Sequence, residues 1–95
     1  MRFDWDTHKA QVNLEKHGVS FEEAEEVFDD PNGFHFFDAA HSIGEIRYNV
    51  IGFSRQRLLF VVYTEREEET TRIISAREAG KYHRRIYEQQ EYDTD

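Results

Sequence analysis

The chain has 95 residues and no cysteine, so it is long enough for one hydrophobic core and can form neither a disulfide nor a thiolate metal site. No apolar run approaches the roughly 20 residues that a membrane-spanning helix needs, and we expect a single cytoplasmic domain over residues 1–95. Twenty acidic residues against twelve Lys and Arg give a formal charge of −8, whereas a nucleic-acid-binding protein is usually basic. Basic residues nevertheless gather between Arg72 and Arg85, and such a local patch can hold a few phosphates.

The N-terminal part of the chain contains the signals of two helices. Asp6 is a suitable N-cap for a helix over residues 7–17, and Gly18 suits the left-handed position that closes it. Ser20 and Glu23 form a capping box, which predicts that a second helix begins there. The Asp-Asp-Pro run that follows its apolar stripe ends this second helix.

Four strands are predicted after the second helix, over residues 34–37, 45–50, 58–63 and 70–75. The second of them alternates apolar and polar residues, which is typical of a strand with one exposed face. The third is apolar on both faces, so we expect it at the centre of the sheet.

A second capping box predicts the last helix. Ser75 and Glu78 have the spacing of such a box, and the helix that it opens should run to about Gln90. We expect residues 91–95 to be frayed. The predicted fold class is therefore α+β, with two N-terminal helices, a four-stranded mostly antiparallel sheet and a C-terminal helix.

The first helix carries an unusual set of polar side chains: Lys9, Asn13, Lys16 and His17. Together they offer cations and hydrogen-bond donors beside the sheet, which suits a phosphate and its flanking ribose. In the structural alternative, His17 interacts with the helix dipole, Asn13 is a satisfied core amide and the lysines are solvated.

The sheet carries residues that could perform acid–base chemistry on a phosphate. Glu45 and Arg47 share one face of the second predicted strand, and Arg72 and Arg77 flank the end of the fourth. Cleavage of RNA needs a base, an acid and cations near the phosphorus, and these residue types supply them without a metal. The structural alternative is cross-strand ion pairing, worth about 0.2–1 kcal/mol per pair.

The five histidines do not have the spacing of a metal site. The sequence contains no His-x-x-x-His or His-x-His pair, and His8 and His17 fall on opposite sides of one helix. We expect neither a bound metal nor a cofactor.

The sequence resembles the BrnT family of ribonuclease toxins over nearly its whole length. The motifs that carry the resemblance are Phe3-x-Trp5-Asp6-x-x-Lys9, Asn13-x-x-Lys16-His17-Gly18-Val19-Ser20-Phe21, Val27-Phe28-Asp29-Asp30-Pro31, Asp38, His41-Ser42, Glu45-x-Arg47, Ile51-Gly52, Tyr63-Thr64-Glu65-Arg66, Arg72-Ile73-Ile74-Ser75-Ala76-Arg77 and Arg84-Arg85-x-Tyr87-Glu88. The resemblance implies a RelE-like fold and cleavage of messenger RNA that arrests growth. It also implies a cognate BrnA-like antitoxin, which is a dimeric DNA-binding protein. The toxin would contact operator DNA only through this antitoxin.

The resemblance also implies roles for matched residues. As catalytic residues we expect His17, His41, Glu45, Arg47 and Arg77. As substrate-binding residues we expect Lys9, Asn13, Lys16, Arg72 and Arg84. Two alternative functions stay open: a non-catalytic scaffold or co-repressor that binds a DNA-binding antitoxin, and a protein whose aromatic surface serves only oligomerisation.

Overall fold

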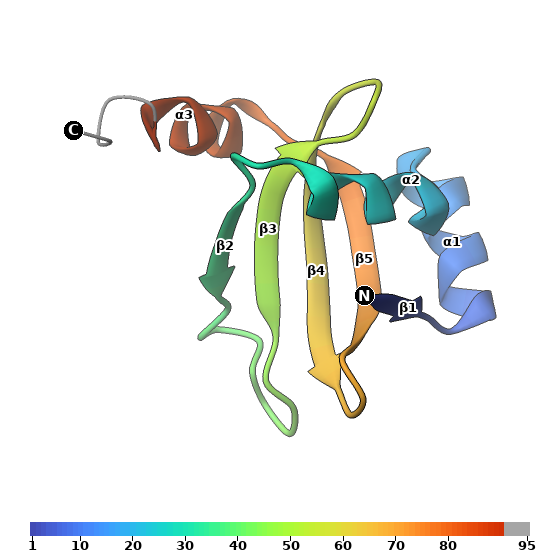
Figure 1. Ribbon diagram of the computed structural model, residues 1–95. Coiled ribbons are helices and arrows are strands. Elements are labelled where there is room, and N and C mark those ends of the chain that lie inside the picture. The colour runs from blue at the N-terminus through green and yellow to red at the C-terminus, as the bar shows by residue number, and fades with distance from the viewer. Residues whose placement is uncertain (91–95) are drawn as a thin grey trace.

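A five-stranded mixed sheet organises the structure, a computed structural model that describes residues 1–90 (Figure 1). The elements are β1 (Arg2–Asp4), α1 (Thr7–His17), α2 (Phe21–Glu26), the 3-10 turn η1 (Val27–Asp29), β2 (Phe34–Phe37), β3 (Tyr48–Phe53), β4 (Leu58–Arg66), β5 (Thr70–Glu78) and α3 (Lys81–Gln89). The strands lie in the order β1-β5-β4-β3-β2. Strands β2 to β5 pair antiparallel, whereas β1 pairs parallel with β5.

The α+β class and both N-terminal helix starts are confirmed. The Asp6 carboxylate accepts hydrogen bonds from the backbone N–H groups of His8 and Lys9, and Gly18 closes α1 with a φ of 70°. The Ser20 hydroxyl accepts from the backbone N–H of Glu23, as its position in a capping box predicts. The predicted frayed tail, residues 91–95, lies outside the described residues.

The prediction of a four-stranded sheet is wrong, because β1 adds a fifth strand. Arg2–Asp4 is only three residues long, too short to show a periodic pattern, and it becomes a strand by pairing with Thr70–Arg72 of β5. The second predicted strand also begins later than expected. Glu45 and Arg47 belong to the loop before β3, which starts at Tyr48.

The second predicted capping box is also wrong. Ser75 and Glu78 lie inside β5, where they pair with Val62 and Leu59 of β4, and α3 begins only after Gly80. A capping box contributes about 1 kcal/mol, whereas a central strand offers a continuous ladder of hydrogen bonds and buried side chains. Tertiary pairing therefore overrides the local signal.

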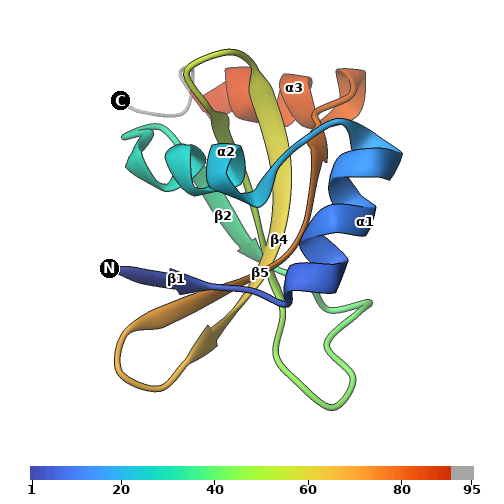
Figure 2. The same cartoon turned by 90° about the vertical axis from the view of Figure 1, so that its right-hand side faces the viewer.

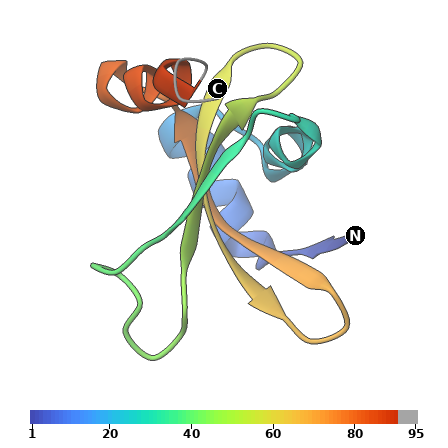
Figure 3. The same ribbon diagram turned by 60° about the vertical axis from the view of Figure 1, so that its left-hand side comes forward.

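Two hydrophobic clusters lie on opposite faces of the sheet. One holds Val50, Leu59 and Val61 against α2 and η1, and the other holds Ile51 and Leu58 against α3. Figure 3 shows α2 and α3 on the two sides of the twisted sheet, and Figure 2 shows α1 alongside β5. Because α3 is short, it covers only part of its face. Within residues 1–90, no helix is long and apolar enough to cross a membrane.

Candidate active site

A cleft of about 340 Å³ lies on the α3 side of the sheet. Three parts of the chain build it: the C-terminal end of α1, the loop between β2 and β3, and the central strands β3, β4 and β5. Its lining residues are His17, Asp38, His41, Arg47, Asn49, Phe60, Val62, Ile74, Ser75 and Arg77.

The floor of the cleft follows from strand register. Asn49 of β3 lies opposite Val62 of β4, and Val62 lies opposite Ser75 of β5, so the three form one row across the sheet. The register of β4 and β5 shifts between Val62 and Tyr63, which leaves Ile74 as an extra residue in β5. Such a bulge re-aims side chains. Both Ile74 and Ser75 consequently line the cleft.

Arg77 reaches the cleft from the neighbouring row, where it lies opposite Phe60. Its guanidinium carbon is 5.3 Å from the centre of the Phe60 ring. His83 of α3 packs on the same ring, with 4.1 Å between ring centres. Burial and the nearby charge of Arg77 lower the pKa of His83. The Phe60 ring thus contacts Arg77 of the cleft and His83 of α3, and it holds the Arg77 guanidinium in place.

The loop between β2 and β3 is closed by hydrogen bonds around Ser42. Its hydroxyl donates to the Asp38 carbonyl at 2.6 Å and accepts from the backbone N–H of Arg47 at 2.9 Å. The backbone N–H of Asp38 donates to the Arg47 carbonyl at 2.9 Å. These bonds bring Asp38 and Arg47, nine positions apart, to the base of one loop.

Asp38 orients His41 at the rim of the cleft. Nδ1 of His41 lies 3.1 Å from both carboxylate oxygens of Asp38, and the side chains are 70% and 11% exposed, respectively. A carboxylate bound to one ring nitrogen fixes the imidazole's orientation. Nε2 of His41 is therefore the ring nitrogen that could exchange a proton with a ligand.

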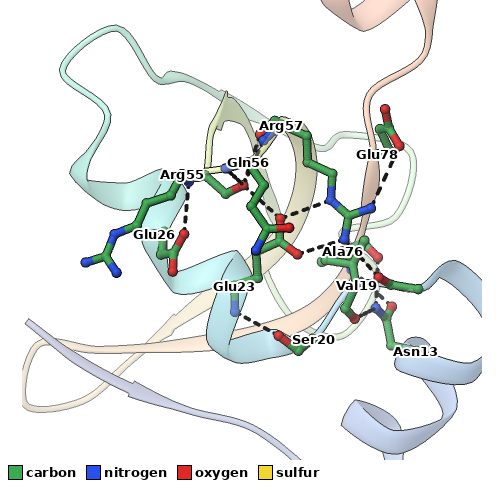
Figure 4. Close-up of polar contacts among 12 residues, drawn as sticks. Asn13, Val19, Ser20, Glu23, Glu26, Arg55, Gln56, Arg57, Ala76 and Glu78 are labelled. Atoms are coloured by element: carbon green, nitrogen blue, oxygen red, sulfur yellow. Dashed lines mark hydrogen bonds and ion pairs between the residues drawn. The ribbon is translucent and has the colours of Figure 1, made fainter.

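His17 is the last residue of α1, and two contacts fix this end of the helix (Figure 4). The Asn13 amide donates to the carbonyls of Val19 and Ala76 at 2.9 and 2.8 Å, and its oxygen accepts from the Ala76 N–H at 3.1 Å. Arg57 donates to the Gly18 carbonyl at 2.8 Å. Asn13 thereby takes the place of a neighbouring strand beside β5, and α1 presents His17 to the cleft.

The predicted site residues divide into those that line the cleft and those that do not. His17, His41, Arg47 and Arg77 meet there. Glu45 does not line it and instead bonds Arg47 at 3.3 Å and Arg66 at 3.4 Å. The remaining predicted residues also lie outside its lining: the exposed Lys9 and Lys16, the buried Asn13, and the half-buried Arg72 and Arg84.

Two of these placements indicate structural roles. Asn13 is 6% exposed, and both the N–H donors and the oxygen of its amide bond backbone groups. It is therefore the satisfied core amide of the structural alternative. Arg72 forms an ion pair with Asp4 at 3.3 Å between β5 and β1. The structure therefore gives no support to direct substrate binding by Asn13.

Four further residues line the cleft that the sequence did not indicate as site residues: Asp38, Asn49, Phe60 and Ser75. The Asp38-x-x-His41 spacing was a usable signal, because a carboxylate three residues before a histidine can bond it within one turn. Asn49, Phe60 and Ser75 had no such signal, since only strand register brings them together. Among the residues that the structure describes, no cluster of three or more His, Asp or Glu could hold a metal ion.

Comparison with known proteins identifies the family. Residues 5–83 match the family model described as the ribonuclease toxin, BrnT, of type II toxin–antitoxin systems. The structure is similar to that of the Brucella abortus ribonuclease toxin BrnT, with 26% sequence identity, a TM-score of 0.67, and coverage of 85% of this chain and 99% of that one. No curated protein sequence matches the chain. The chain therefore belongs to the BrnT family of ribonuclease toxins of type II toxin–antitoxin systems, as its sequence motifs indicated.

Proposed function

We propose that this chain is a toxin that arrests growth in the cytoplasm by cleaving messenger RNA, and that it does so without a metal ion. The observation that carries the proposal is the cleft, which brings His17, His41, Arg47 and Arg77 together from distant parts of the sequence. Its residues supply what cleavage of a phosphodiester needs: proton-transfer groups and cations around the phosphorus.

The proposed reaction uses the RNA's own 2′-hydroxyl. His41, oriented by Asp38, removes the proton from this hydroxyl, and the oxygen attacks the adjacent phosphorus. His17 protonates the departing 5′-oxygen, so the products are a 2′,3′-cyclic phosphate and a 5′-hydroxyl end. Arg47 and Arg77 stabilise the negative charge that builds on the phosphoryl oxygens.

The residues outside the cleft have supporting roles in this proposal. Glu45 positions Arg47 through their ion pair. Lys9, Lys16, Arg72 and Arg84 contribute contacts to flanking phosphates, which position a strand but do not react.

The ribonuclease proposal is tested by incubating the purified protein with single-stranded RNA in excess EDTA. We expect cleavage to persist and to yield cyclic phosphate ends, with a strong loss in His41→Ala. His8→Ala, which changes an exposed histidine of α1 outside the lining of the cleft, is the matched control. Loss of cleavage on chelation with rescue by Mg²⁺ would overturn metal independence.

Membership of the family implies an antitoxin partner. We propose a BrnA-like antitoxin, a dimeric DNA-binding protein that covers the cleft and alone connects the toxin to operator DNA. The formal charge of −8 would steer a basic partner, so the association rate should fall with added salt. Co-expression with the product of the neighbouring gene should relieve growth arrest and give one complex in size-exclusion chromatography.

The same charge favours a second candidate, a non-catalytic scaffold that binds a DNA-binding antitoxin and acts as co-repressor. This candidate predicts the complex but neither RNA cleavage nor growth arrest. Expression of the chain alone in cells therefore separates the two.

A further inference from the structure

Asn49 lines the floor of the cleft and carries a polar atom without a partner. The residue is 6% exposed, and among residues 1–90 its Oδ1 is the one buried side-chain oxygen or nitrogen that has no hydrogen-bond partner. A buried acceptor left unpaired costs about 1–3 kcal/mol, so most native proteins avoid one. An exception at a functional cleft points to a ligand that supplies the missing donor.

The surroundings of Asn49 indicate the chemistry of that ligand. Val62 lies beside it on β4, and Ile74 also lines the cleft, so the carboxamide stands next to an apolar surface. The charged and titratable groups of the cleft come instead from β5, the end of α1 and the loop between β2 and β3. The cleft thus has a cationic part suited to phosphate and a part with an amide and apolar side chains, which suits a flat heterocycle.

We propose that Asn49 is a base-specificity residue, whose Oδ1 accepts a hydrogen bond from the amino group of an adenine or cytosine beside the scissile phosphate. This inference rests on the proposed ribonuclease function. Adenine and cytosine both present an amino donor next to a ring-nitrogen acceptor, and a carboxamide matches that pair with its own oxygen and N–H. Uracil lacks this amino group but can pair its N3–H and a carbonyl with a carboxamide, so the comparison that isolates the amino donor is between each base and its analogue without that group.

The test removes the amino group from the substrate and the carboxamide from the protein. The substrates are DNA oligonucleotides with one cleavable ribonucleotide, in which the base on either side of the scissile phosphate is adenine, cytosine, or the analogue of one of them without its amino group, purine or 2-pyrimidinone. We expect the wild-type protein to prefer adenine over purine, or cytosine over 2-pyrimidinone, by about 5- to 100-fold in kcat/KM. In Asn49→Leu, which keeps the branched shape of the side chain but lacks the amide, this preference should disappear.

Thermal unfolding separates ligand recognition from a structural role. Removing an unpaired buried acceptor should leave the Tm of Asn49→Leu equal to or above that of the wild type. The control is Thr64→Val, because the Thr64 hydroxyl donates to the Ile46 carbonyl at 2.6 Å and does not line the cleft. This control should lower the Tm and keep the base preference. An unchanged preference in Asn49→Leu, or a wild-type protein that cleaves the substrates with and without the amino group equally well, would overturn the proposal.

Failure of the ribonuclease proposal would be visible separately. If the wild-type protein cleaves no substrate, fluorescence anisotropy with uncleavable 2′-O-methyl oligonucleotides still measures the preference for the base with the amino group over its analogue without it. Discrimination by the wild type that Asn49→Leu loses would support base reading by Asn49 even then. Equal binding of both oligonucleotides, or no binding, would reject it.

Discussion

Arg57 donates to both carboxylate oxygens of Glu23, from Nη2 to Oε1 at 2.7 Å and from Nε to Oε2 at 3.0 Å. The Glu23 carboxylate also accepts from the Ser54 hydroxyl at 2.7 Å, and the same Arg57 binds the Gly18 carbonyl at the end of α1. Figure 4 shows how this network ties α2 to the β3–β4 turn and to the connection after α1. The network thereby fixes the end of α1, where His17 meets the cleft.

We expect Arg57→Met to lower the free energy of unfolding by about 3 kcal/mol, because it leaves the mostly buried Glu23 carboxylate without its charged partner. In a domain of this size the Tm should fall by about 10 °C or more. Arg55→Met, in the same turn but with an exposed residue, is the matched control and should change the Tm little. Equal effects of the two substitutions would show that the Glu23 contact contributes no stability.

The stability should also depend on pH through Glu23. The hydrogen bond from Arg57 lowers the pKa of Glu23 below its ordinary value of 4.5, despite the opposing effect of burial. In the unfolded chain the Glu23 carboxylate therefore takes up a proton at a higher pH than in the folded chain. The contribution of Glu23 to the free energy of unfolding is present above pH 4.5 and is lost as the pH falls below it. Urea unfolding between pH 7 and pH 3 measures the slope, which should be shallower in Glu23→Gln.

Asn13→Ala should destabilise the protein by about 1–3 kcal/mol, because it leaves the N–H and carbonyl of Ala76 and the carbonyl of Val19 without the hydrogen bonds that Asn13 makes. It should also reduce RNA cleavage, since α1 would no longer hold His17 in place. Gln11→Ala, an exposed position on the same helix, serves as the control. A loss of activity at unchanged Tm would instead make Asn13 a substrate contact, contrary to its placement.

Asp38→Asn should lower kcat, because the amide would no longer hold Nδ1 of His41 with two carboxylate oxygens. His41→Ala should cost about 10²- to 10⁴-fold in kcat, the usual contribution of a general base. Circular dichroism checks that both variants fold. If Asp38→Asn left kcat unchanged, Asp38 would serve only to close the loop.

Arg77→Met should lower kcat/KM by about 10²-fold while keeping most of the stability, because the thioether can still pack on the Phe60 ring. Arg55→Met changes an exposed arginine of the β3–β4 turn outside the cleft and should leave kcat/KM nearly unchanged. Cleavage kinetics and thermal melts on the same preparations provide the measurement. Parallel losses of Tm and activity would make Arg77 a structural residue.

The ends of the two N-terminal helices and the family follow from the amino-acid sequence, because they depend on local signals. Asp6 and Gly18 fixed the ends of α1, and Ser20 fixed the start of α2, because a cap is formed by residues close in the chain. The ordered motifs also determined the family, which the comparisons confirm.

The short strand β1, the end of β5 and the composition of the cleft depend instead on residues that are distant in the sequence. Arg2–Asp4 is a strand only because β5 offers it an edge, and Ser75 is a strand residue because pairing with β4 outweighs a local cap. The same pairing places Asn49, Val62 and Ser75 in one row, while Asn13 reaches across to Ala76 and turns His17 toward them. Periodicity and spacing carry no record of strand register, so the composition of the cleft followed only from the folded chain.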